Sequence, residues 1–350
     1  IMRGCIRGCR FCQAGMIYRP TRQKNVETLK QYAREMVATT GHEEISLSSL
    51  SSSDYECLKE FIYFLIDEIS NNDINISLPS LRIDAFSLDV MKRVQDVKKS
   101  SLTFAPEAGS QRLRNVINKN ITEEDITSST YTAFMGGYNG VKLYFMMGLP
   151  TETDEDIMGI ADLASLVADQ YFKVPKESRN KGLTITVSTS CFVPKPHTPF
   201  QWEPMDSIEE LERKQHILQN SINRRFIKYN WHDADLSYME AVFARGDRKL
   251  SKVLIEAQKS GIKFDGWSEF FNLGKWKEIF EKCGIDPDFY VTRKREYTEI
   301  LPWGHINAGV SQEFLKRENE KAKKGETTVR CGEHCSGCGA NTFGGGVCYE

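Results

Sequence analysis

Short apolar segments alternate with amphipathic segments from residue 25 to about residue 200. The apolar segments have the length of strands, and the amphipathic ones repeat apolar residues every three or four positions, as helices do. Such alternation predicts an α/β fold in which a parallel sheet is covered by helices. Strands are predicted at 44–49, 75–78, 101–105, 141–147 and 183–190, and helices at 25–40, 53–69, 87–97 and 154–171, with two more between the third and fourth strands.

Local signals predict where several of these helices begin and end. Capping boxes, in which a Ser or Thr and an acid three residues later satisfy each other's backbone N–H, predict three starts. Gly41 predicts the end of the first helix, because glycine readily adopts the left-handed conformation found there. The three boxes are Ser53-x-x-Glu56, Thr122-x-x-Asp125 and Thr153-x-x-Asp156.

The pattern changes after Pro204, where the sequence favours helices only. The amphipathic segment 207–229 predicts one long helix, and further helices are predicted at 235–260 and 267–284. The run FLKRENEKAKKGE, at 314–326, is strongly charged and predicts a solvated connector. We therefore expect three parts, a partial barrel at 1–205, a helical region at 206–325 and a cysteine-rich tail at 326–350.

The N-terminal run IMRGCIRGCRFCQAG carries Cys5, Cys9 and Cys12 in the spacing C-x3-C-x2-C. Three thiolates can hold a [4Fe–4S] cluster by three of its irons and leave the fourth iron without a protein ligand. That iron can bind the amino and carboxylate groups of S-adenosylmethionine (SAM). An electron from the cluster then breaks a carbon–sulfur bond. The spacing therefore predicts an enzyme that generates a 5′-deoxyadenosyl radical.

The residues around these cysteines suit such a cluster. Gly4 and Gly8 are predicted to let the backbone pass close to it, and the three arginines of the run are predicted to favour the thiolate form. Zinc binding or unrelated buried thiols are the alternatives. Zinc would need a fourth ligand nearby, whereas the next cysteine is Cys57 and the nearest histidine is His42.

The chain begins inside this loop and lacks an initiator methionine, so we expect it to be a fragment. Barrel active sites form at the C-terminal ends of strands, so a strand should precede Arg3. Ile1 and Met2 would be its last residues, and the missing remainder would leave an open sheet edge at 44–49.

Composition narrows the classes of function. The chain of 350 residues is 40% hydrophobic and 27% charged, has a net charge of −2, and contains no apolar run long enough to cross a bilayer. This net charge gives no general electrostatic attraction to nucleic acid or to anionic membranes. Ten cysteines without a secretory signal predict a cytoplasmic, reducing location in which cysteines bind metal.

A second cysteine group repeats the first spacing near the C-terminus. It comprises Cys331, Cys335 and Cys338, with Cys348 ten residues further on. Here a fourth ligand is available, either Cys348 or His334. The group therefore predicts a closed zinc site or a second iron–sulfur cluster, and the sequence leaves both open.

With its three cysteines ahead of repeated βα units, the chain up to about residue 205 resembles the radical SAM superfamily. The resemblance implies a partial (β/α)6 TIM-type barrel whose first strand is mostly missing. It implies that Phe11 lies beside the adenine and that Glu107, in FAPEAGSQRLR, binds the ribose hydroxyls. It also implies that Gly148, in GLPTETDED, and Phe192 and Val193, in CFVPKPHTPFQW, line the adenine pocket.

The methionine end of SAM is less well defined by the resemblance. Many members hold the amino group with a Gly-Gly-Glu stretch, and this chain has Ser48 and Ser49 in SLSSLSSSD at that place. Serine hydroxyls or backbone carbonyls would then bind the amine. Arg112 could reach the carboxylate or be an ordinary surface arginine of a helix.

Six segments together resemble one functionally uncharacterised bacterial family that typically has a cobalamin-binding domain before the barrel. The resemblance implies cobalamin in the intact protein and methyl transfer to an unactivated carbon. The segments are RGCIRGCRFCQAG, SLPSLRID, TFAPEAGSQRLR, FMMGLPTETDED, FVPKPHTPFQW and LPWGHINAGV.

Two alternatives remain. Methylthiotransferases, which modify tRNA or protein, resemble the chain slightly in FVPKPHTPF, but they place their extra cysteines upstream of the barrel. A non-enzymatic electron-transfer or docking protein is the other, with the aromatic-rich helical region binding a protein partner. A radical enzyme implies a reductant such as flavodoxin or ferredoxin and a substrate that the sequence does not identify.

Overall fold

The computed structural model describes residues 1–69, 74–77 and 102–343. Predictions for 87–97, the segment SLPSLRID and Cys348 lie outside these residues. The strands are β1 (Met2–Arg3), β2 (Arg22–Gln23), β3 (Glu44–Ser46), β4 (Asn75–Ser77), β5 (Leu102–Glu107), β6 (Gly140–Met147), β7 (Thr184–Cys191) and β8 (Ile227–Trp231).

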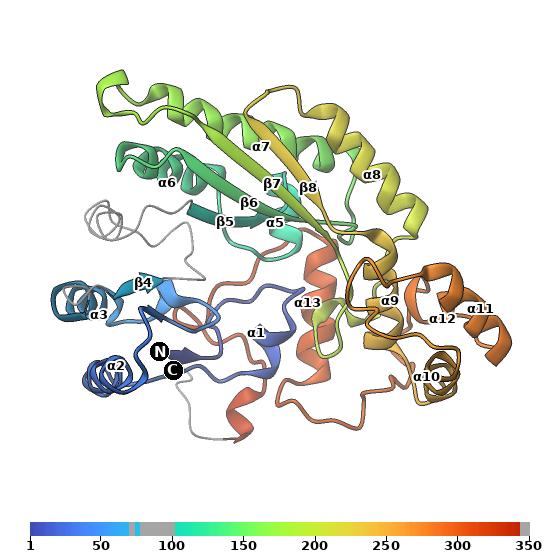
Figure 1. The fold of residues 1–350 in the computed structure, drawn as a ribbon. Coiled ribbons are helices and arrows are strands. Elements are labelled where there is room, and N and C mark those ends of the chain that lie inside the picture. The colour runs from blue at the N-terminus through green and yellow to red at the C-terminus, as the bar shows by residue number, and fades with distance from the viewer. Residues whose placement is uncertain (70–73, 78–101, 344–350) are drawn as a thin grey trace.

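The α-helices are distributed over the whole described chain and are numbered as in Figure 1. They are α1 (Gln13–Ile17), α2 (Val26–Thr40), α3 (Leu58–Phe64), α5 (Gln111–Val116), α6 (Glu123–Met135), α7 (Asp154–Lys173), α8 (Ile208–Ser221), α9 (Ala234–Arg245), α10 (Leu250–Lys259), α11 (Leu273–Cys283), α12 (Asp288–Val291) and α13 (Gln312–Lys323). Short 3-10 or π turns are η1 (Ser52–Asp54), η2 (Leu65–Ile69), η5 (Lys176–Ser178), η6 (Pro199–Trp202) and η7 (Ala340–Phe343).

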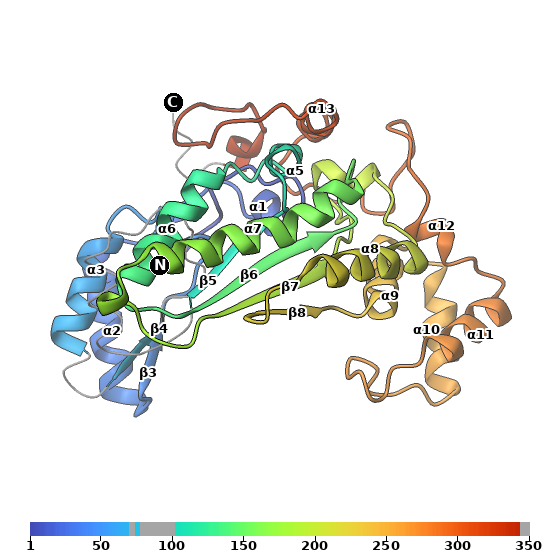
Figure 2. The same cartoon turned by 90° about the horizontal axis from the view of Figure 1, so that it is seen from above.

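A parallel four-stranded sheet, in the order β5-β6-β7-β8, is the centre of the fold. Helices α6, α7 and α8 cover one of its faces, while α1 and α13 lie on the other side (Figures 1 and 2). Strands β3 and β4 form a separate parallel pair, which packs with α2 and α3. The predicted α/β class with a parallel sheet is confirmed.

The sheet has one apolar and one polar face. On β6 the buried positions are Val141, Leu143 and Phe145, which pair in register with Ile185, Val187 and Thr189 of β7. Because side chains alternate between faces along a strand, these residues share the face toward α6 and α7, and all of them except Thr189 belong to the main core.

The opposite face carries the residues between them. Lys142 and Tyr144 of β6 pair with Thr186 and Ser188 of β7, and Ser188 pairs with Asn230 of β8. A parallel sheet covered on both faces would read as a nearly continuous apolar run. The strict alternation seen here indicates that this face is not part of an apolar core.

Strand β8 corrects the prediction of helices only after residue 204. The segment 207–229 is not one helix, because α8 ends at Ser221 and the chain then turns into a strand parallel to β7. The alternation in FIKYNW is short, and its apolar residues also fit a helical stripe. Pairing with β7 decides between the two.

Other predicted boundaries are partly confirmed. Both capping boxes at Thr122 and Thr153 are present, and Gly41 ends α2 with φ of 67°. The box at Ser53 is wrong, since Ser53 lies in a 3-10 turn and α3 begins only after Cys57.

Two further expectations change in the structure. The predicted helix 235–260 is divided into α9 and α10 at Gly246. Met2 lies in β1, which pairs antiparallel with β2 and does not extend the parallel sheet. Ile1 nevertheless lies near the end of β3, because its amino group donates to the Ser48 carbonyl at 3.1 Å. Within the described residues β3 pairs with β4 alone, in line with the expected open edge.

The predicted solvated connector at 314–326 is also wrong. Most of it belongs to α13, which buries Phe314, Leu315 and Ala322 against the rest of the molecule. The described part of the chain has no helix with both the length and the apolar content needed to cross a bilayer.

The loop between β5 and α5 packs against α7 so closely that it needs glycine. A Cβ built on Gly109 would lie 2.3 Å from the Ile160 nitrogen and 2.5 Å from the Gly159 carbonyl carbon. These are backbone atoms of a long helix, which cannot move aside alone.

Gly109→Ala should therefore lower the free energy of unfolding by about 3 kcal/mol, near the upper end for overpacking. Gly266→Ala is the control, because a Cβ at Gly266 would have no neighbour within 4 Å. Urea unfolding of both variants checks this. Equal stabilities would contradict the close packing of α7 on the loop.

Candidate functional site

The cluster loop, residues 4–12, joins β1 to α1 and carries Cys5, Cys9 and Cys12. Cys12 is the N-cap of α1, and its sulfur accepts a hydrogen bond from the Gly15 N–H at 3.3 Å. Gly4 has φ of 78°, and a Cβ there would lie 2.5 Å from the Tyr18 carbonyl oxygen. Glycine is therefore required at this position by the close approach of the Tyr18 backbone, while its predicted role beside a cluster stays a prediction.

The three thiols lie near one another. The pKa of Cys5 is raised to about 11, chiefly by burial and in smaller part by the charges of Cys9, Asp54 and Cys12. Burial also raises the pKa of Cys12, and Cys9 adds to the effect. Loss of these protons therefore requires a positively charged group at the loop, and a metal cluster would provide one.

The donor set fits an iron–sulfur cluster. In the described residues no three His, Cys, Asp or Glu side chains converge on a point where one metal ion could sit. A cubane presents its irons at separate corners, so its thiolates surround a larger body and need not share one point. The three neighbouring thiols of this loop match the number of protein ligands that a cubane with one open iron needs.

Two of the three arginines predicted to favour the thiolates, Arg7 and Arg10, form ion pairs with acids. Arg7 donates to both carboxylate oxygens of Asp54, at 2.9 and 3.2 Å from its Nε. Arg10 is fully buried and bonds to Glu318 of α13. Lys119 lowers the pKa of Cys12 through its positive charge. The backbone N–H of Arg7 lowers the pKa of Cys5 through a hydrogen bond.

Glu107 lies at the C-terminal end of β5, where the register with β6 shifts, and its φ is 69°. Its carboxylate accepts a bond from Lys119 Nζ at 3.1 Å. Both side chains act on the ionisation of Cys12 and so lie near it. The structure therefore brings the predicted ribose contact to the cluster loop, together with a lysine that the sequence did not single out.

The predicted adenine residues separate into two groups. Phe11 packs against an apolar cluster that contains Phe192 and Phe200, whose rings meet edge to face at 5.8 Å. Val193 is buried in a different core, formed with α9 to α12. The structure thus brings Phe11 and Phe192 together, but not Val193 with them.

The serine-rich segment reaches the cluster loop through Asp54. Ser49 Oγ is 3.0 Å from Ser52 Oγ, and Ser51 Oγ donates to Asp54 at 2.6 Å. Asp54 in turn holds Arg7. The segment of Ser48 and Ser49 is therefore adjacent to the predicted cluster, as its proposed role requires.

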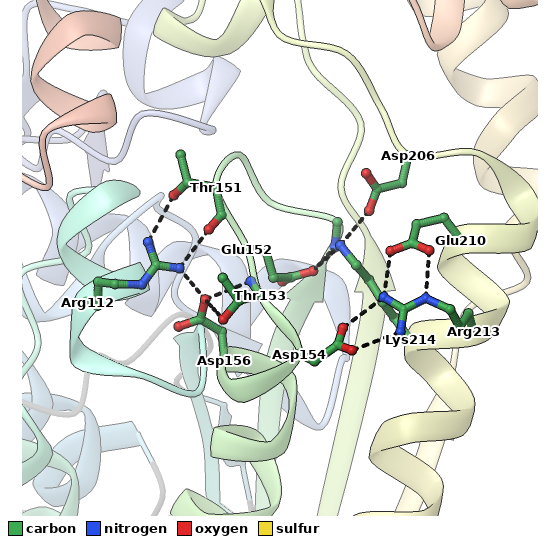
Figure 3. Close-up of polar contacts among 11 residues, drawn as sticks. Arg112, Thr151, Glu152, Thr153, Asp154, Asp156, Asp206, Glu210, Arg213 and Lys214 are labelled. Carbon is green, nitrogen blue, oxygen red and sulfur yellow. Dashed lines mark hydrogen bonds and ion pairs between the residues drawn. The ribbon is translucent and has the colours of Figure 1, made fainter.

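Gly148 lies at a cavity of about 190 Å³ where β6 ends, lined by both apolar and charged residues. The Gly148 N–H donates to the buried carboxylate of Glu152 at 2.6 Å, and Lys214 bonds to Glu152 at 3.0 Å and to Asp206 at 2.7 Å (Figure 3). Asn319 of α13 also lines this cavity. Sequence reasoning noticed the GLPTETDED motif but missed Glu152.

Arg112 is held away from the loop by contacts of its own. It donates to Thr151 Oγ1 at 3.1 Å and to the Thr151 carbonyl at 2.7 Å, and it pairs with Asp156 (Figure 3). Its side chain is about half exposed. These contacts fit the alternative of a surface arginine that stabilises the start of α7.

The tail cysteines have different surroundings. The Cys331 N–H donates to the Ile6 carbonyl in the cluster loop at 2.9 Å, so this cysteine lies beside the first site. Cys335 is exposed and Cys338 is buried. The predicted second metal site stays a prediction, since Cys348 lies outside the described residues.

Burial raises the pKa of Glu152 from 4.5 to about 7, although Lys214 and the Gly148 N–H oppose this. The folded state therefore keeps a proton that the unfolded state releases between pH 4.5 and 7. Stability should fall as the pH rises through that window, because the unfolded state binds fewer protons there.

Glu152→Gln removes this pH dependence, because the amide stays neutral. We compare the free energy of unfolding of the variant with that of the native chain. From pH 5 to pH 8 this difference should shift by about 2 kcal/mol in favour of the variant, since one pKa unit is worth about 1.4 kcal/mol. Urea unfolding from pH 5 to 8 measures it, with Glu155→Gln on the exposed side of α7 as a control. Parallel curves for Glu152→Gln and the native chain would contradict the assignment.

One curated relative is an uncharacterized protein, MJ0966, of Methanocaldococcus jannaschii. It is 36% identical over 289 residues, which are 80% of this chain and 61% of the relative. The chain thus spans about three fifths of the length of that relative.

Two solved structures are similar at low identity. One is coproporphyrinogen III oxidase (HemN) from Escherichia coli, described as a radical SAM enzyme, with 18% identity, a TM-score of 0.42, and coverage of 63% of this chain and 50% of that one. The other is HydG, a maturase of the [FeFe]-hydrogenase, with 14% identity, a TM-score of 0.41, and coverage of 94% and 82%. Scores this low carry no statement about activity.

The family model of the radical SAM superfamily matches residues 1–164. This part contains the cluster loop, the serine segment, Glu107 and Gly148. Residues 1–164 of the chain are therefore similar to a domain of the radical SAM superfamily.

Proposed function

We propose that the chain binds a [4Fe–4S] cluster through Cys5, Cys9 and Cys12 and uses it to cleave SAM reductively. The observation that carries the proposal is the set of three neighbouring thiols on one loop, beside the C-terminal end of β5. When bound, the cluster supplies the electron that breaks the carbon–sulfur bond of SAM and so releases a 5′-deoxyadenosyl radical. A reductant such as flavodoxin or ferredoxin would supply that electron.

The chain's own residues would hold SAM around this loop. Glu107 offers carboxylate oxygens for the ribose hydroxyls, and Lys119 orients this carboxylate through a hydrogen bond. Phe11 and Phe192 offer an apolar surface for the adenine. Ser48 and Ser49 would receive the methionine amino group, while Arg112, Gly148 and Val193 have weaker support from the geometry.

The substrate is proposed to be polar. The cluster loop lies on the side of the β5–β8 sheet opposite α7 and α8 (Figures 1 and 2). The polar face of the sheet points to the same side. A radical formed at the loop would meet side chains such as Tyr144, Ser188 and Asn230. These groups can bind hydroxyl, amide or carboxylate groups of a substrate.

Methyl transfer with cobalamin is the more specific proposal, and it rests on the family resemblance of the six sequence segments. The cobalamin would be held by a part of the intact protein outside this chain. Sulfur insertion, as in methylthiotransferases, is a second candidate. It is favoured by one observation, the position of Cys331 beside Ile6, which would place a second cluster near the first.

Cys9→Ala should lose the N-terminal cluster and all formation of 5′-deoxyadenosine, because a cubane held by two thiolates is labile. Cys283→Ala, in α11, is the matched control and should keep both. Iron analysis, electron spin resonance with and without SAM, and product assay after anaerobic reconstitution measure this. An intact cluster in Cys9→Ala, or no response to SAM in the native chain, would contradict the proposal.

Cys335→Ser should lower the bound zinc or iron of the tail without unfolding the chain, since this side chain is exposed. Metal analysis distinguishes the two metals. Native amounts of both iron and zinc in the variant would exclude a metal site at the tail cysteines.

A further inference from the structure

The cluster loop is connected to the C-terminal helix α13 by a buried ion pair. Arg10, between Cys9 and Cys12, has no exposed surface, and the side chain of Glu318 is 2% exposed. Arg10 donates from Nε and Nη2 to the same Glu318 oxygen, at 3.2 and 3.1 Å. Its remaining N–H groups donate to the carbonyls of Val116 at 2.9 Å and Glu326 at 2.8 Å.

A second chain of contacts closes a ring around this pair. Thr328 Oγ1 donates to Glu318 at 2.9 Å, and the Thr328 N–H donates to Asn118 Oδ1 at 2.8 Å. Asn118 Nδ2 then donates to the Gly8 carbonyl of the cluster loop at 3.1 Å. The loop is therefore held to the C-terminal segment on both sides of Cys9.

Close packing makes this contact specific. A Cβ at Gly8 would lie 2.8 Å from Asn118 Nδ2, so the loop backbone and Asn118 are already in contact. Further along, the Cys331 N–H donates to the Ile6 carbonyl. Residues 326–331 thus run alongside residues 6–10, although more than 300 positions separate them in the sequence.

The loop has no helix or strand of its own between β1 and α1. Its conformation must therefore come from contacts with other parts of the chain. Arg10 makes several of them, and its charge is balanced by Glu318. A buried guanidinium without that carboxylate would be driven toward water and would pull the loop with it.

We propose that Glu318 is a positioning residue for the cluster: through Arg10 it holds the loop in the conformation in which Cys5, Cys9 and Cys12 face one another. The inference rests on the proposed function, because it assumes that these thiols bind the cluster. It adds that a helix outside the family-matched region 1–164 is needed for a stable cluster.

The experiment compares Glu318→Ala and Glu318→Gln with Glu320→Ala in the full chain. Glu320 is exposed on the same helix and pairs with Lys323 and Tyr297, so its loss tests helix damage alone. Thermal melting of the metal-free proteins measures folding. The rate at which a chelator removes iron under anaerobic conditions measures cluster stability. Only the iron that is missing from Cys9→Ala is counted, because that iron belongs to the N-terminal cluster.

Glu318→Ala should lose this iron roughly 10-fold faster than the native chain, as changes behind metal ligands commonly do. The electron spin resonance spectrum of its reduced cluster should also change. Glu318→Gln keeps an acceptor for Arg10, so its rate of iron loss should lie between those of the native chain and Glu318→Ala. Glu320→Ala should lose iron at the native rate. Native iron retention and spectrum in a folded Glu318→Ala would overturn the proposal.

If Glu318→Ala does not fold, the double variant Arg10→Met with Glu318→Met removes both charges together and decides. Native cluster stability in that folded variant would overturn the role of the ion pair, and faster iron loss would support it. A native chain that holds the cluster but yields no 5′-deoxyadenosine would refute the proposed function while leaving these iron measurements valid. A native chain without Cys9-dependent iron would refute both.

Discussion

The ion pair between Arg10 and Glu318 joins the first residues of the chain to its last helix. Both groups are removed from water, so each depends on the other and on the surrounding carbonyls for its solvation. The cysteines flank one end of this pair, and α13 carries the other. The geometry of the cluster loop is therefore a property of the whole described chain, and the family-matched segment alone does not contain all of its supports.

The amphipathic sheet gives the site its second constraint. Its apolar face is covered by α6, α7 and α8, which leaves the polar face toward the cluster loop. A sheet with fixed register provides a rigid wall beside the cluster loop. Strand β8 extends this face by one strand and adds Asn230 to it.

Much of this arrangement could be predicted from local patterns. The strands β3 to β7, the caps at Thr122 and Thr153, and the three-cysteine loop all depend on residues close together in sequence. Strand β8 and helix α13 could not be predicted in the same way. Helix α13 has too few apolar residues among its many charges to predict burial, although Phe314, Leu315 and Ala322 are buried. Nothing in the sequence distinguishes Glu318 from a solvated acid until Arg10 is placed opposite it.

The order of residues alone therefore determined the α/β class and predicted the three-cysteine loop and the resemblance to the radical SAM superfamily, because periodicity and cysteine spacing are short-range properties. Folding in three dimensions decided which charges meet. Arg7 and Arg10 were expected beside thiolates and are paired with Asp54 and Glu318 instead. The physical reason is that a buried charge requires a partner in space, and the partner of Arg10 lies 308 positions away along the chain.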